Sequence, residues 1–461
     1  DMMLDAASAF DYTFAAAAIN ISGDLTLNGA KLNIASNGTM PFGTYSLITY
    51  SGALANDDLS LGTTPSTSPL GYVYTIDTLT PHAVNLVAIP NGINIFQAWG
   101  GGTDGTGKGS GTWNNANTNW LDPIGGFVPT TWGSGYGTFG GPGGTVTIEG
   151  QQSSVGLEFT NGDYTLAAGA GGSLLLHRYD SPDFTIVVPE LRVLPNITAT
   201  ISATIEGADG MRKSGDGTLI LSGANTYSGG TTISGGTLQI SSNANLGDAG
   251  GALTFDTGIG TLYTTQTMST ARAVNLLDSA TFEIAAGTTL SASGATTGAG
   301  ALIKTGEGAL SLSGSNGWLG GTLLMAGTLR SDGLGALPDN TDYIITGGTL
   351  DLNGNGLTMR SLWGTGGAIA LGSAQLTIDQ ATDTFFAGTI SGTGGLTKDG
   401  TGTLLLSGNN TYLGGTTIAG GALAIISDAN LGDASGAINF SGGTLTTFGN
   451  IITGRSIDVS G

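Results

Sequence analysis

Apolar residues recur two positions apart along most of this chain, in short stretches that end at glycine or at Asn-Gly pairs. One such stretch has its apolar residues at Leu404, Leu406, Ile418, Leu423 and Ile425. Alternation of this kind is typical of a strand with one buried face, and no stretch shows the helical period of 3.6. The pattern therefore predicts strand, turn and strand again, with almost no helix.

One longer pattern occurs three times. Its copies run from Met211 to Leu238, from Lys304 to Leu329 in a degenerate form, and from Leu396 to Leu423, and their matching lysines are 91 and 94 residues apart. A nearly fixed period is typical of stacked repeats. A single copy is too short to bury a core, but stacked strands about 4.8 Å apart align their inward leucines and pair their backbones. The sequence predicts an all-β fold, a parallel β-solenoid.

Every copy of the repeat carries a lysine, an asparagine and an aromatic residue at fixed places. These are Lys213, Asn225 and Tyr227; Lys304, Asn316 and Trp318; and Lys398, Asn410 and Tyr412. A row of lysines could bind an anionic glycan, but the copies lie about four rungs of 4.8 Å apart, too far for one pocket. We favour structural roles, with each asparagine bonding to the backbone of its turn. We expect the following side chains to be buried: Leu219, Leu221, Leu404, Leu406, Tyr412 and Ile418.

The repeated string resembles that of a known family. Lys-x-Gly-x-Gly-Thr-Leu-x-Leu-Ser-Gly-x-Asn-Thr-Tyr-x-Gly-Gly-Thr-Thr-Ile is nearly complete at Lys213–Ile233 and Lys398–Ile418. It is similar to the autotransporter-associated β-strand repeat, also called the passenger-associated transport repeat. Ala98–Trp120 and Gly43–Gly52 also resemble segments common in such proteins. The resemblance implies a right-handed β-helix in a secreted or surface-displayed bacterial protein, with a repeat linked to export, and it implies no catalytic residue.

Changes of pattern divide the chain into four regions. Residues 1–97 alternate as strands, with a projecting loop at Asp57–Gly71, and form a candidate segment for docking between subunits. Residues 98–143 are an irregular connector rich in Trp, Gly and Asn. Residues 144–208 resume short strands as solenoid rungs, and residues 209–461 hold the three-copy repeat.

The connector contains four of the six tryptophans, Trp99, Trp113, Trp120 and Trp132. One hypothesis is a glycan-binding platform, because indole rings stack on sugars and asparagine bonds to hydroxyls. The other is that the large rings plug the core where regular rungs are absent. We favour the plug, because the resemblance identifies this segment as a recurring connector.

Composition limits the partners. Thirty-three acidic against 12 basic residues give a net charge of −21, which argues against nucleic acid and anionic membrane surfaces. The 83 glycines fit the corners of an ordered all-β protein, and cysteine is absent. No apolar run is long enough to span a bilayer. We expect no cofactor; Gly101–Gly107, Asn245–Asp248 and Asn430–Asp433 are candidate calcium loops, for which turn chemistry is the favoured interpretation.

A second recurring element is an arginine before a short strand, at Arg272, Arg360 and Arg455, with Arg192 as a fourth candidate. In a chain with so few cations, each arginine is expected to pair with an acidic side chain on a neighbouring rung. A solvated corner is the equally weighted alternative.

Enzymatic chemistry finds little support in the sequence. Many β-helical enzymes cleave acidic polysaccharides with clustered carboxylates, but here the acidic residues are dispersed as single turn residues. The two histidines, His82 and His177, lie at no spacing typical of a catalytic triad. We expect no enzyme, and a polysaccharide lyase or hydrolase is the least favoured hypothesis.

The expected function is a secreted structural solenoid that forms an extracellular fibre or surface stalk, with a glycan-binding adhesin passenger as the alternative. Residues 440–459 retrace residues 255–276, and the chain stops at Gly461 within the third period. Leu25–Tyr50 looks like a segment that follows such repeats in the resembling proteins. We therefore expect copies to associate head to tail as a homopolymer, the N-terminal strands of one covering the open rung of the next.

Overall fold

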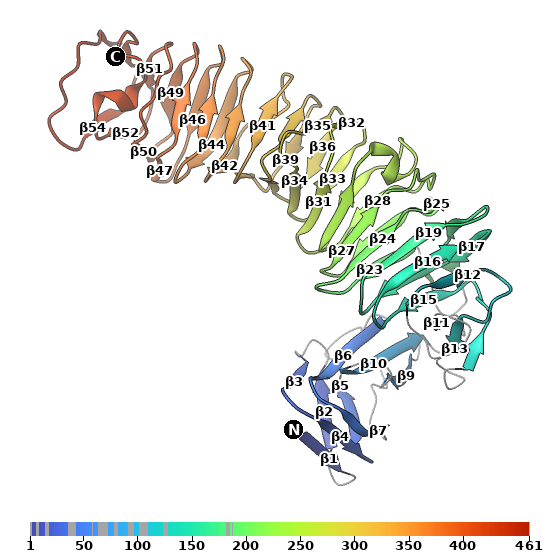
Figure 1. Ribbon diagram of the computed structural model, residues 1–461. Coiled ribbons are helices and arrows are strands. Elements are labelled where there is room, and N and C mark those ends of the chain that lie inside the picture. Colours follow the sequence, from blue (N-terminus) through green and yellow to red (C-terminus); the bar gives the residue numbers. More distant parts are fainter. Residues whose placement is uncertain are drawn as a thin grey trace. The chain divides into compact units, whose positions relative to one another are not determined.

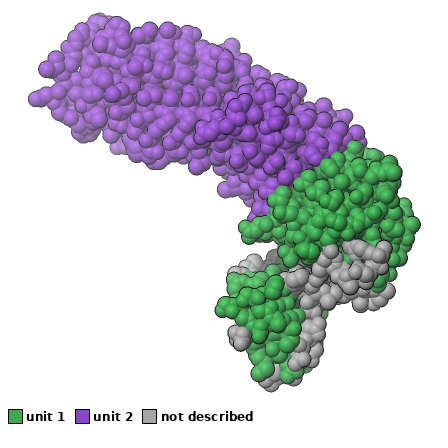
Figure 2. All heavy atoms as spheres, viewed as in Figure 1, with its two compact units in different colours: residues 1–209 green, residues 210–461 purple. Residues whose placement is uncertain are grey.

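The computed structural model describes residues 2–5, 9–13, 18–35, 43–57, 59–62, 72–77, 82–90, 96–100, 109–122, 128–180, 185–186 and 188–460. The chain divides into unit 1, residues 1–209, and unit 2, residues 210–461 (Figure 2). Over the described ranges the ordered elements are strands and two 3₁₀ turns, η1 (Asn243–Leu246) and η2 (Asp428–Leu431). The all-β prediction is confirmed. Most of the expected loop Asp57–Gly71 and all of Gly101–Gly107 lie outside the described residues.

Unit 2 is a parallel β-solenoid, and its strands follow one another as stacked layers (Figure 1). Each strand pairs in parallel with the strand one rung later, as in the series Met211, Thr231, Leu253 and Val274. These steps of 20, 22 and 21 residues each make one rung, which contains two or three short strands with turns between them. The predicted solenoid is thus confirmed.

Four parallel sheets form the sides of unit 2. Sheet 1 contains β26 (Met211–Ser214), β28 (Thr231–Ile233), β30 (Leu253–Phe255), β33 (Val274–Leu276), β36 (Thr296–Gly298) and β39 (Gly317–Trp318). Sheet 2 contains β27 (Thr218–Leu221), β29 (Thr237–Ile240), β31 (Gly260–Thr264), β34 (Ala280–Ile284), β37 (Leu302–Thr305), β40 (Thr322–Leu324), β42 (Thr341–Ile345), β44 (Leu357–Trp363), β46 (Leu376–Asp379), β49 (Leu396–Asp399), β51 (Thr416–Ile418), β53 (Ile438–Phe440) and β55 (Ile457–Val459).

The other two sheets begin later in the chain. Sheet 3 contains β32 (Met268–Thr270), β35 (Thr289–Ala292), β38 (Ala309–Leu312), β41 (Thr328–Ser331), β43 (Thr349–Asp351), β45 (Ala368–Ala370) and β48 (Thr389–Ser391). Sheet 4 contains β47 (Thr384–Phe386), β50 (Thr403–Leu406), β52 (Ala422–Ile425) and β54 (Thr444–Thr447).

Alternation along these strands places every second side chain in the core. In β50, for example, Leu404 and Leu406 are buried while Thr403 and Leu405 face outward. Burial stabilises the fold by about 1.5 to 3 kcal/mol for each such side chain. All of the side chains predicted to lie inside are completely buried: Leu219, Leu221, Leu404, Leu406, Tyr412 and Ile418.

The sequence repeat is out of phase with the sides of the solenoid. β26, with Lys213, lies in sheet 1, whereas β37 and β49, with Lys304 and Lys398, lie in sheet 2. Four rungs lead from Met211 to Thr296, and the second copy begins six residues further on, at the next side. The first period is therefore four rungs plus one side.

The second period spans five rungs, because β44 is used twice. Its C-terminal half pairs with the rung before, through Tyr343 and Leu362, and its N-terminal half with the rung after, through Leu357 and Leu376. A β-bulge between Thr341 and Asp342 accompanies this change of register. Spacing alone therefore misjudged the number of rungs in the second period.

The N-terminal part of unit 1 mixes parallel and antiparallel pairs, which departs from a regular solenoid. β10 pairs antiparallel with both β6 and β9, around a small core that includes Leu27, Leu47 and Leu86. The strands of its three sheets are β1 (Met2–Asp5), β4 (Leu25–Asn28) and β7 (Leu54–Asp57); β2 (Ala9–Thr13), β5 (Lys31–Ala35) and β8 (Ser60–Leu61); and β3 (Ile19–Ile21), β6 (Gly43–Tyr50), β10 (Ala83–Pro90) and β9 (Tyr72–Asp77).

The remainder of unit 1 becomes regular and parallel after an antiparallel insertion. β13 pairs antiparallel with β11 and β14, and from β15 onward the rungs pair in parallel. The strands are β11 (Phe96–Trp99), β13 (Trp120–Asp122), β14 (Val128–Thr130), β15 (Tyr136–Phe139), β18 (Gly156–Phe159) and β23 (Glu190–Val193); β12 (Gly111–Trp113), β16 (Gly144–Ile148), β19 (Tyr164–Ala168) and β24 (Thr198–Ile201); β17 (Gln151–Ser154), β20 (Ser173–Leu176) and β25 (Thr204–Glu206); and the pair β21 (Tyr179–Asp180) and β22 (Thr185–Ile186).

Candidate functional site

The lysine of each repeat turns into the solenoid and binds backbone carbonyl groups. Lys213 Nζ donates to the carbonyl oxygens of Ser214 at 2.9 Å, Gly215 at 2.7 Å and Gly235 at 3.1 Å. Two of these carbonyls belong to its own turn and the third to the turn one rung later. An ammonium has three N–H donors, so three acceptors satisfy it completely.

The other two lysines repeat this geometry. Lys304 Nζ donates to Thr305 at 2.6 Å, Gly306 at 2.7 Å and Ala326 at 3.3 Å, and Lys398 Nζ donates to Asp399, Gly400 and Gly420. All three lysine residues are completely buried. Burial lowers the pKa of Lys304 to about 8, although Glu307 and Glu283 act to raise it. None of these ammonium groups faces the solvent, where an anionic glycan would lie.

The asparagine of each repeat links neighbouring rungs. Asn410 Oδ1 accepts from the backbone N–H of Ile390 at 2.8 Å, one rung earlier, and its Nδ2 donates to the carbonyl of Asn430 at 2.6 Å, one rung later. Asn316 does the same with Thr296 and Ala336, both at 2.7 Å. Asn225 Nδ2 donates to the carbonyl of Asn245 at 2.6 Å. These contacts support the interpretation of the asparagines as corner residues.

The aromatic residue of each repeat is buried and bonds to a threonine four residues later. The hydroxyls of Tyr412 and Thr416 are 2.6 Å apart, and burial raises the pKa of Tyr412 to about 12. Tyr227 and Thr231 repeat the pair at 2.8 Å, and Trp318 Nε1 donates to Thr322 at 3.1 Å. The lysine, asparagine and aromatic residue of one copy are hereafter called its corner network.

Two buried arginines bind the loops that were candidate calcium sites. Arg455 donates from Nε to Asp428 Oδ1 at 3.0 Å, and its terminal nitrogens reach the carbonyls of Gly432, at 2.7 Å, and Asp433. Arg272 makes the same contacts in the earlier loop: Asn243 Oδ1 at 3.0 Å, the carbonyl of Gly247 at 2.7 Å and that of Asp248. Loop carbonyls that a calcium ion would use therefore face a guanidinium group, whose positive charge repels a cation.

The expected arginine pairs are confirmed for three of the four positions. Arg360 pairs with Asp342, Arg455 with Asp428, and Arg192 with Glu158 at 3.3 Å. The expectation is wrong for Arg272, which meets the amide of Asn243 where Arg455 meets a carboxylate. Burial lowers the pKa of Arg272.

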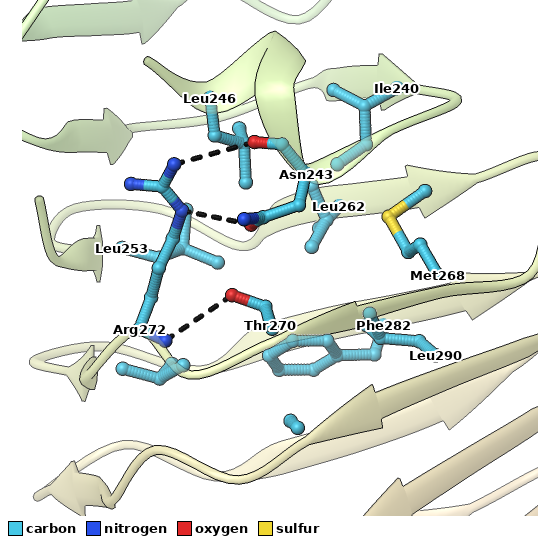
Figure 3. A pocket seen from close by; sticks show the side chains of 12 residues that line it. Ile240, Asn243, Leu246, Leu253, Leu262, Met268, Thr270, Arg272, Phe282 and Leu290 are labelled. Carbon is cyan, nitrogen blue, oxygen red and sulfur yellow. Dashed lines mark hydrogen bonds between the residues drawn. The ribbon is translucent and has the colours of Figure 1, made fainter. Parts of the chain in front are cut away.

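A small cavity lies beside Arg272 (Figure 3). Its volume of about 20 Å³ suits a single water molecule and no larger ligand. At its edge Arg272 donates from its backbone N–H to Thr270 Oγ1 and from Nε to Asn243 Oδ1, and the other lining residues are apolar. The cavity therefore provides no site for a substrate or cofactor.

The four connector tryptophans form one aromatic cluster inside unit 1. Trp113 and Trp120 are completely buried, and Trp99 and Trp132 are 3% and 6% exposed. Ring centroids of neighbouring members are 4.2 to 5.2 Å apart. No ring face is open for a sugar to stack on, which favours the plug over the glycan platform.

Over the described ranges, no group of three or more histidine, aspartate or glutamate side chains lies close enough to hold a metal ion. Among the same residues, no helix has the length and apolarity needed to cross a membrane. The signature residues of the repeat are instead engaged with backbone carbonyls, amides and hydroxyls. Among them, the lysines and the asparagines join neighbouring rungs.

Comparison with known proteins identifies the repeat. The Passenger-associated-transport-repeat family matches residues 211–240, 302–330 and 396–425, the ranges that hold the three corner networks. The chain carries three passenger-associated transport repeats. The resemblance noted at Lys213–Ile233 and Lys398–Ile418 is therefore confirmed. Transport repeats of this kind indicate a secreted or cell-surface protein.

A curated relative, the "Adhesin BmaC autotransporter" of Brucella suis biovar 1 (strain 1330), is 35% identical over 344 residues. The match covers 68% of this chain and 9% of the relative, so the chain spans less than a tenth of that protein's length. No solved structure matches the chain significantly.

One internal polar residue was missed by the sequence analysis. Gln380 is completely buried, and its amide nitrogen Nε2 donates to the carbonyls of Thr382 at 3.0 Å and Thr403 at 2.8 Å. Its Oε1 accepts from Thr384 at 3.0 Å. Gln380 lies outside the three repeats, and a lone glutamine after an aspartate gives no sequence signal of such a role.

Proposed function

We propose that this chain is a passenger segment whose transport repeats form part of the stalk of a surface-displayed adhesin. The observation that carries the proposal is the internal use of the signature residues. In every copy the lysine and the asparagine bind one rung to the next, and the buried aromatic residue bonds to a threonine four residues later. A repeat used in this way builds length and rigidity, which is what a stalk requires.

A stalk role predicts that whole rungs are interchangeable units. Residues 376–395 make one rung, since Leu376 pairs with Leu396. Deleting these residues should leave Leu396 stacked on Leu357, shorten unit 2 by about 4.8 Å, and change the melting midpoint by less than about 5 °C. Circular dichroism and small-angle scattering of the full chain measure both effects.

A half-rung deletion is the matched control. Removing residues 376–385 puts every later strand on the wrong side of the solenoid, so the β content should fall sharply. Collapse of the full-rung variant to the same extent would contradict the stalk proposal, because its rungs would not then be independent units.

Head-to-tail association of copies is the finer form of this proposal. β55 pairs on one side with β53, and its residues Ile457 and Val459 are 52% and 78% exposed. A strand with one free edge accepts another strand, whether from the same polypeptide or from a second copy. If the N-terminal strands of another copy pair with this edge, deleting residues 1–34 should abolish the filaments, which electron microscopy detects. Filaments that persist after the deletion would contradict head-to-tail association.

An adhesive role is a second candidate, favoured by the name of the relative. The test is binding of the full chain to a glycan array. Loss of this binding in Trp113→Ala and Trp120→Ala variants of normal β content would assign the adhesive role to the tryptophan cluster. The burial of both rings disfavours that location.

A further inference from the structure

An apolar ladder runs along the outer face of unit 2, one side chain per rung. Consecutive rungs place its members in register: Ile303 beside Leu323, Leu323 beside Ile344, and Ile344 beside Trp363. The chain neighbours of Ile303, Leu302 and Lys304, point into the core, so Ile303 points outward. The same alternation holds on each of the following rungs. The ladder members are Ile303, Leu323, Ile344, Trp363, Phe385 and Leu405, all partly exposed.

The same column is polar in the preceding rungs. Thr237, Thr261 and Thr281 stack in register and lead directly to Ile303. Threonine is the ordinary outward residue of this face, since it suits a pleated surface in contact with water. The change from threonine to large apolar side chains is therefore a local feature of the rungs that follow.

The ladder is centred on the rung where the solenoid is irregular. There β44 changes partner, and the rings of Trp363 and Phe385 meet edge to face with centroids 5.3 Å apart. Two positions before Trp363 on the same strand, Ser361 Oγ donates to Asp342 Oδ1 at 2.7 Å. Arg360 donates to the same carboxylate and is itself more than half exposed. A hydroxyl, a carboxylate and a guanidinium thus lie about 7 Å along the strand from the partly exposed side chain of Trp363.

A second copy of the chain does not suit this surface. Five of the six side chains are partly buried and Ile344 is 38% exposed. Together they offer on the order of 300 Å² of apolar area, well below the roughly 800 Å² per partner of a stable dimer.

A peptide strand does not suit the surface either. β37, β40, β42, β44 and β50 are paired on both sides, and β47 pairs with β50 on one side and is bridged to Gly364 on the other. The ladder therefore offers no free edge to which a strand could be added. A thin, flat ligand with apolar ring faces and hydroxyl edges does match an apolar ladder beside a polar cluster. The spacing of about 4.8 Å between ladder members is also close to the length of one sugar unit in a linear glycan.

We propose that the apolar ladder binds a linear, uncharged polysaccharide that lies along the solenoid axis, with Trp363 and Phe385 beneath one sugar ring. Arg360, Asp342 and Ser361 bond to hydroxyls at the edge of that ring. The ligand is uncharged because the Arg360 and Asp342 charges cancel locally and the acidic chain repels polyanions. This site is independent of the stalk proposal, which concerns the interior of the rungs.

The test uses the full chain and immobilised hexasaccharides of β-1,4-glucose, β-1,3-glucose, β-1,4-mannose and α-1,4-glucose, with hexagalacturonate and a heparin hexasaccharide as acidic probes. Binding of at least one neutral hexasaccharide is expected, stronger than binding of its disaccharide. Trp363→Ala should weaken it at least about tenfold, as expected when one aromatic contact is lost. The triple variant I303T/L323T/I344T, which extends the threonine column, should weaken it similarly.

Tyr263→Ala is the matched control, because Tyr263 also lies on the outer face of sheet 2 but has Gln239 and Glu283 beside it. It should bind as the unmodified chain does, and all variants should keep their β content and melting midpoint. Absence of binding to every neutral probe, equal binding of the acidic probes, or unchanged binding by Trp363→Ala would overturn the proposal. If the unmodified chain is a dimer and the triple variant is a monomer, the ladder is instead the contact surface for a second copy.

Discussion

Oδ1 of Asp428 accepts a hydrogen bond of 3.0 Å from Nε of the buried Arg455. In the earlier loop an amide, that of Asn243, occupies this place beside Arg272 at the same distance. Burial acts to raise the pKa of Asp428, but the hydrogen bond and the charge of Arg455 lower the pKa by a larger amount. The pKa of Asp428 therefore lies below its ordinary value. The two loops therefore hold the same arginine network with and without a neutralising charge.

Exchanging these two residues should move stability in opposite directions. Asp428→Asn is expected to destabilise the chain by about 1 kcal/mol, because a charge-assisted bond to a buried guanidinium becomes a neutral one. Asn243→Asp should stabilise by up to about 1 kcal/mol, since it supplies Arg272 with a counter-charge. Urea unfolding at pH 7 followed by circular dichroism measures both changes.

The pH dependence gives the control for this exchange. Because the pKa of folded Asp428 lies below that of the unfolded chain, its contribution is present above about pH 4 and is lost as the pH falls through the folded pKa. The difference between Asp428→Asn and the unmodified chain should therefore vanish in strong acid. A constant difference at all pH values would mean that the charge of Asp428 is not the cause.

A glycine of the same loop is predicted to be irreplaceable because of the neighbouring tyrosine. Gly432 has a φ of +84°, and a Cβ there would lie 2.6 Å from the carbonyl oxygen of Tyr412 and 2.7 Å from its ring. Gly287 has a φ of +73° but nothing within 4 Å of the corresponding position. Gly287→Ala should therefore cost only about 1 kcal/mol of backbone strain.

Gly432→Ala adds a clash with backbone atoms to the strain of a φ of +84° and a ψ of −160°, so it should cost at least about 2 to 3 kcal/mol. Thermal melting of the two variants side by side separates strain from contact. Equal losses in both variants would show that the Tyr412 ring moves aside at no cost.

The sequence was sufficient to predict the strands, their inward leucines and the buried Tyr412, because a period of two residues reports which face of a strand is covered. It did not reveal that the copies begin on different sides of the solenoid. That phase depends on a few turn residues, such as the three between Gly298 and Leu302, because the lengths of the turns add up from rung to rung. Neither did it reveal the apolar ladder, because Ile303, Leu323 and Ile344 become neighbours only when rungs stack.

The candidate sites were harder to judge, because residue type does not report exposure. A tryptophan such as Trp120 in a segment rich in glycine and asparagine suits a sugar platform and a core plug equally well, and burial separates them. The arginines illustrate the same limit. Arg360 and Arg455 are each followed by a serine and an apolar residue, yet one lies at the surface and the other is buried against a loop.

The plug interpretation predicts that the tryptophan cluster stabilises unit 1. Trp120→Ala removes a completely buried ring whose centroid is 4.2 Å from that of Trp132 and 5.0 Å from that of Trp113. The expected loss in the stability of unit 1 is about 3 to 5 kcal/mol. Amide hydrogen exchange should therefore be faster in unit 1 of the variant than in the unmodified chain. Arg330→Ala, at an exposed ion pair in unit 2, is the control and should change little. An unaltered exchange pattern in Trp120→Ala would show that the tryptophan cluster does not stabilise the core of unit 1.

The buried lysine of the second repeat provides the last prediction. Replacing Lys304 by Met keeps a side chain of similar length but leaves the carbonyls of Thr305, Gly306 and Ala326 without their donor. The expected loss at pH 7 is about 1 to 3 kcal/mol, the cost of unpaired buried acceptors.

The same substitution has a defined pH dependence. Burial lowers the pKa of Lys304 to about 8 in the folded chain, whereas an unfolded lysine titrates near 10.4. Between these values the unfolded chain binds a proton that the folded chain does not, so raising the pH favours folding of the unmodified chain. Lys304→Met lacks this gain, and the stability gap between the two proteins should therefore widen from pH 8 to pH 10. The pKa of Lys398 is also lowered by burial, so Lys398→Met should behave in the same direction. A gap that narrows over this range, measured by urea unfolding of both variants, would mean that the ammonium is stabilised by its three carbonyls more strongly than burial opposes it.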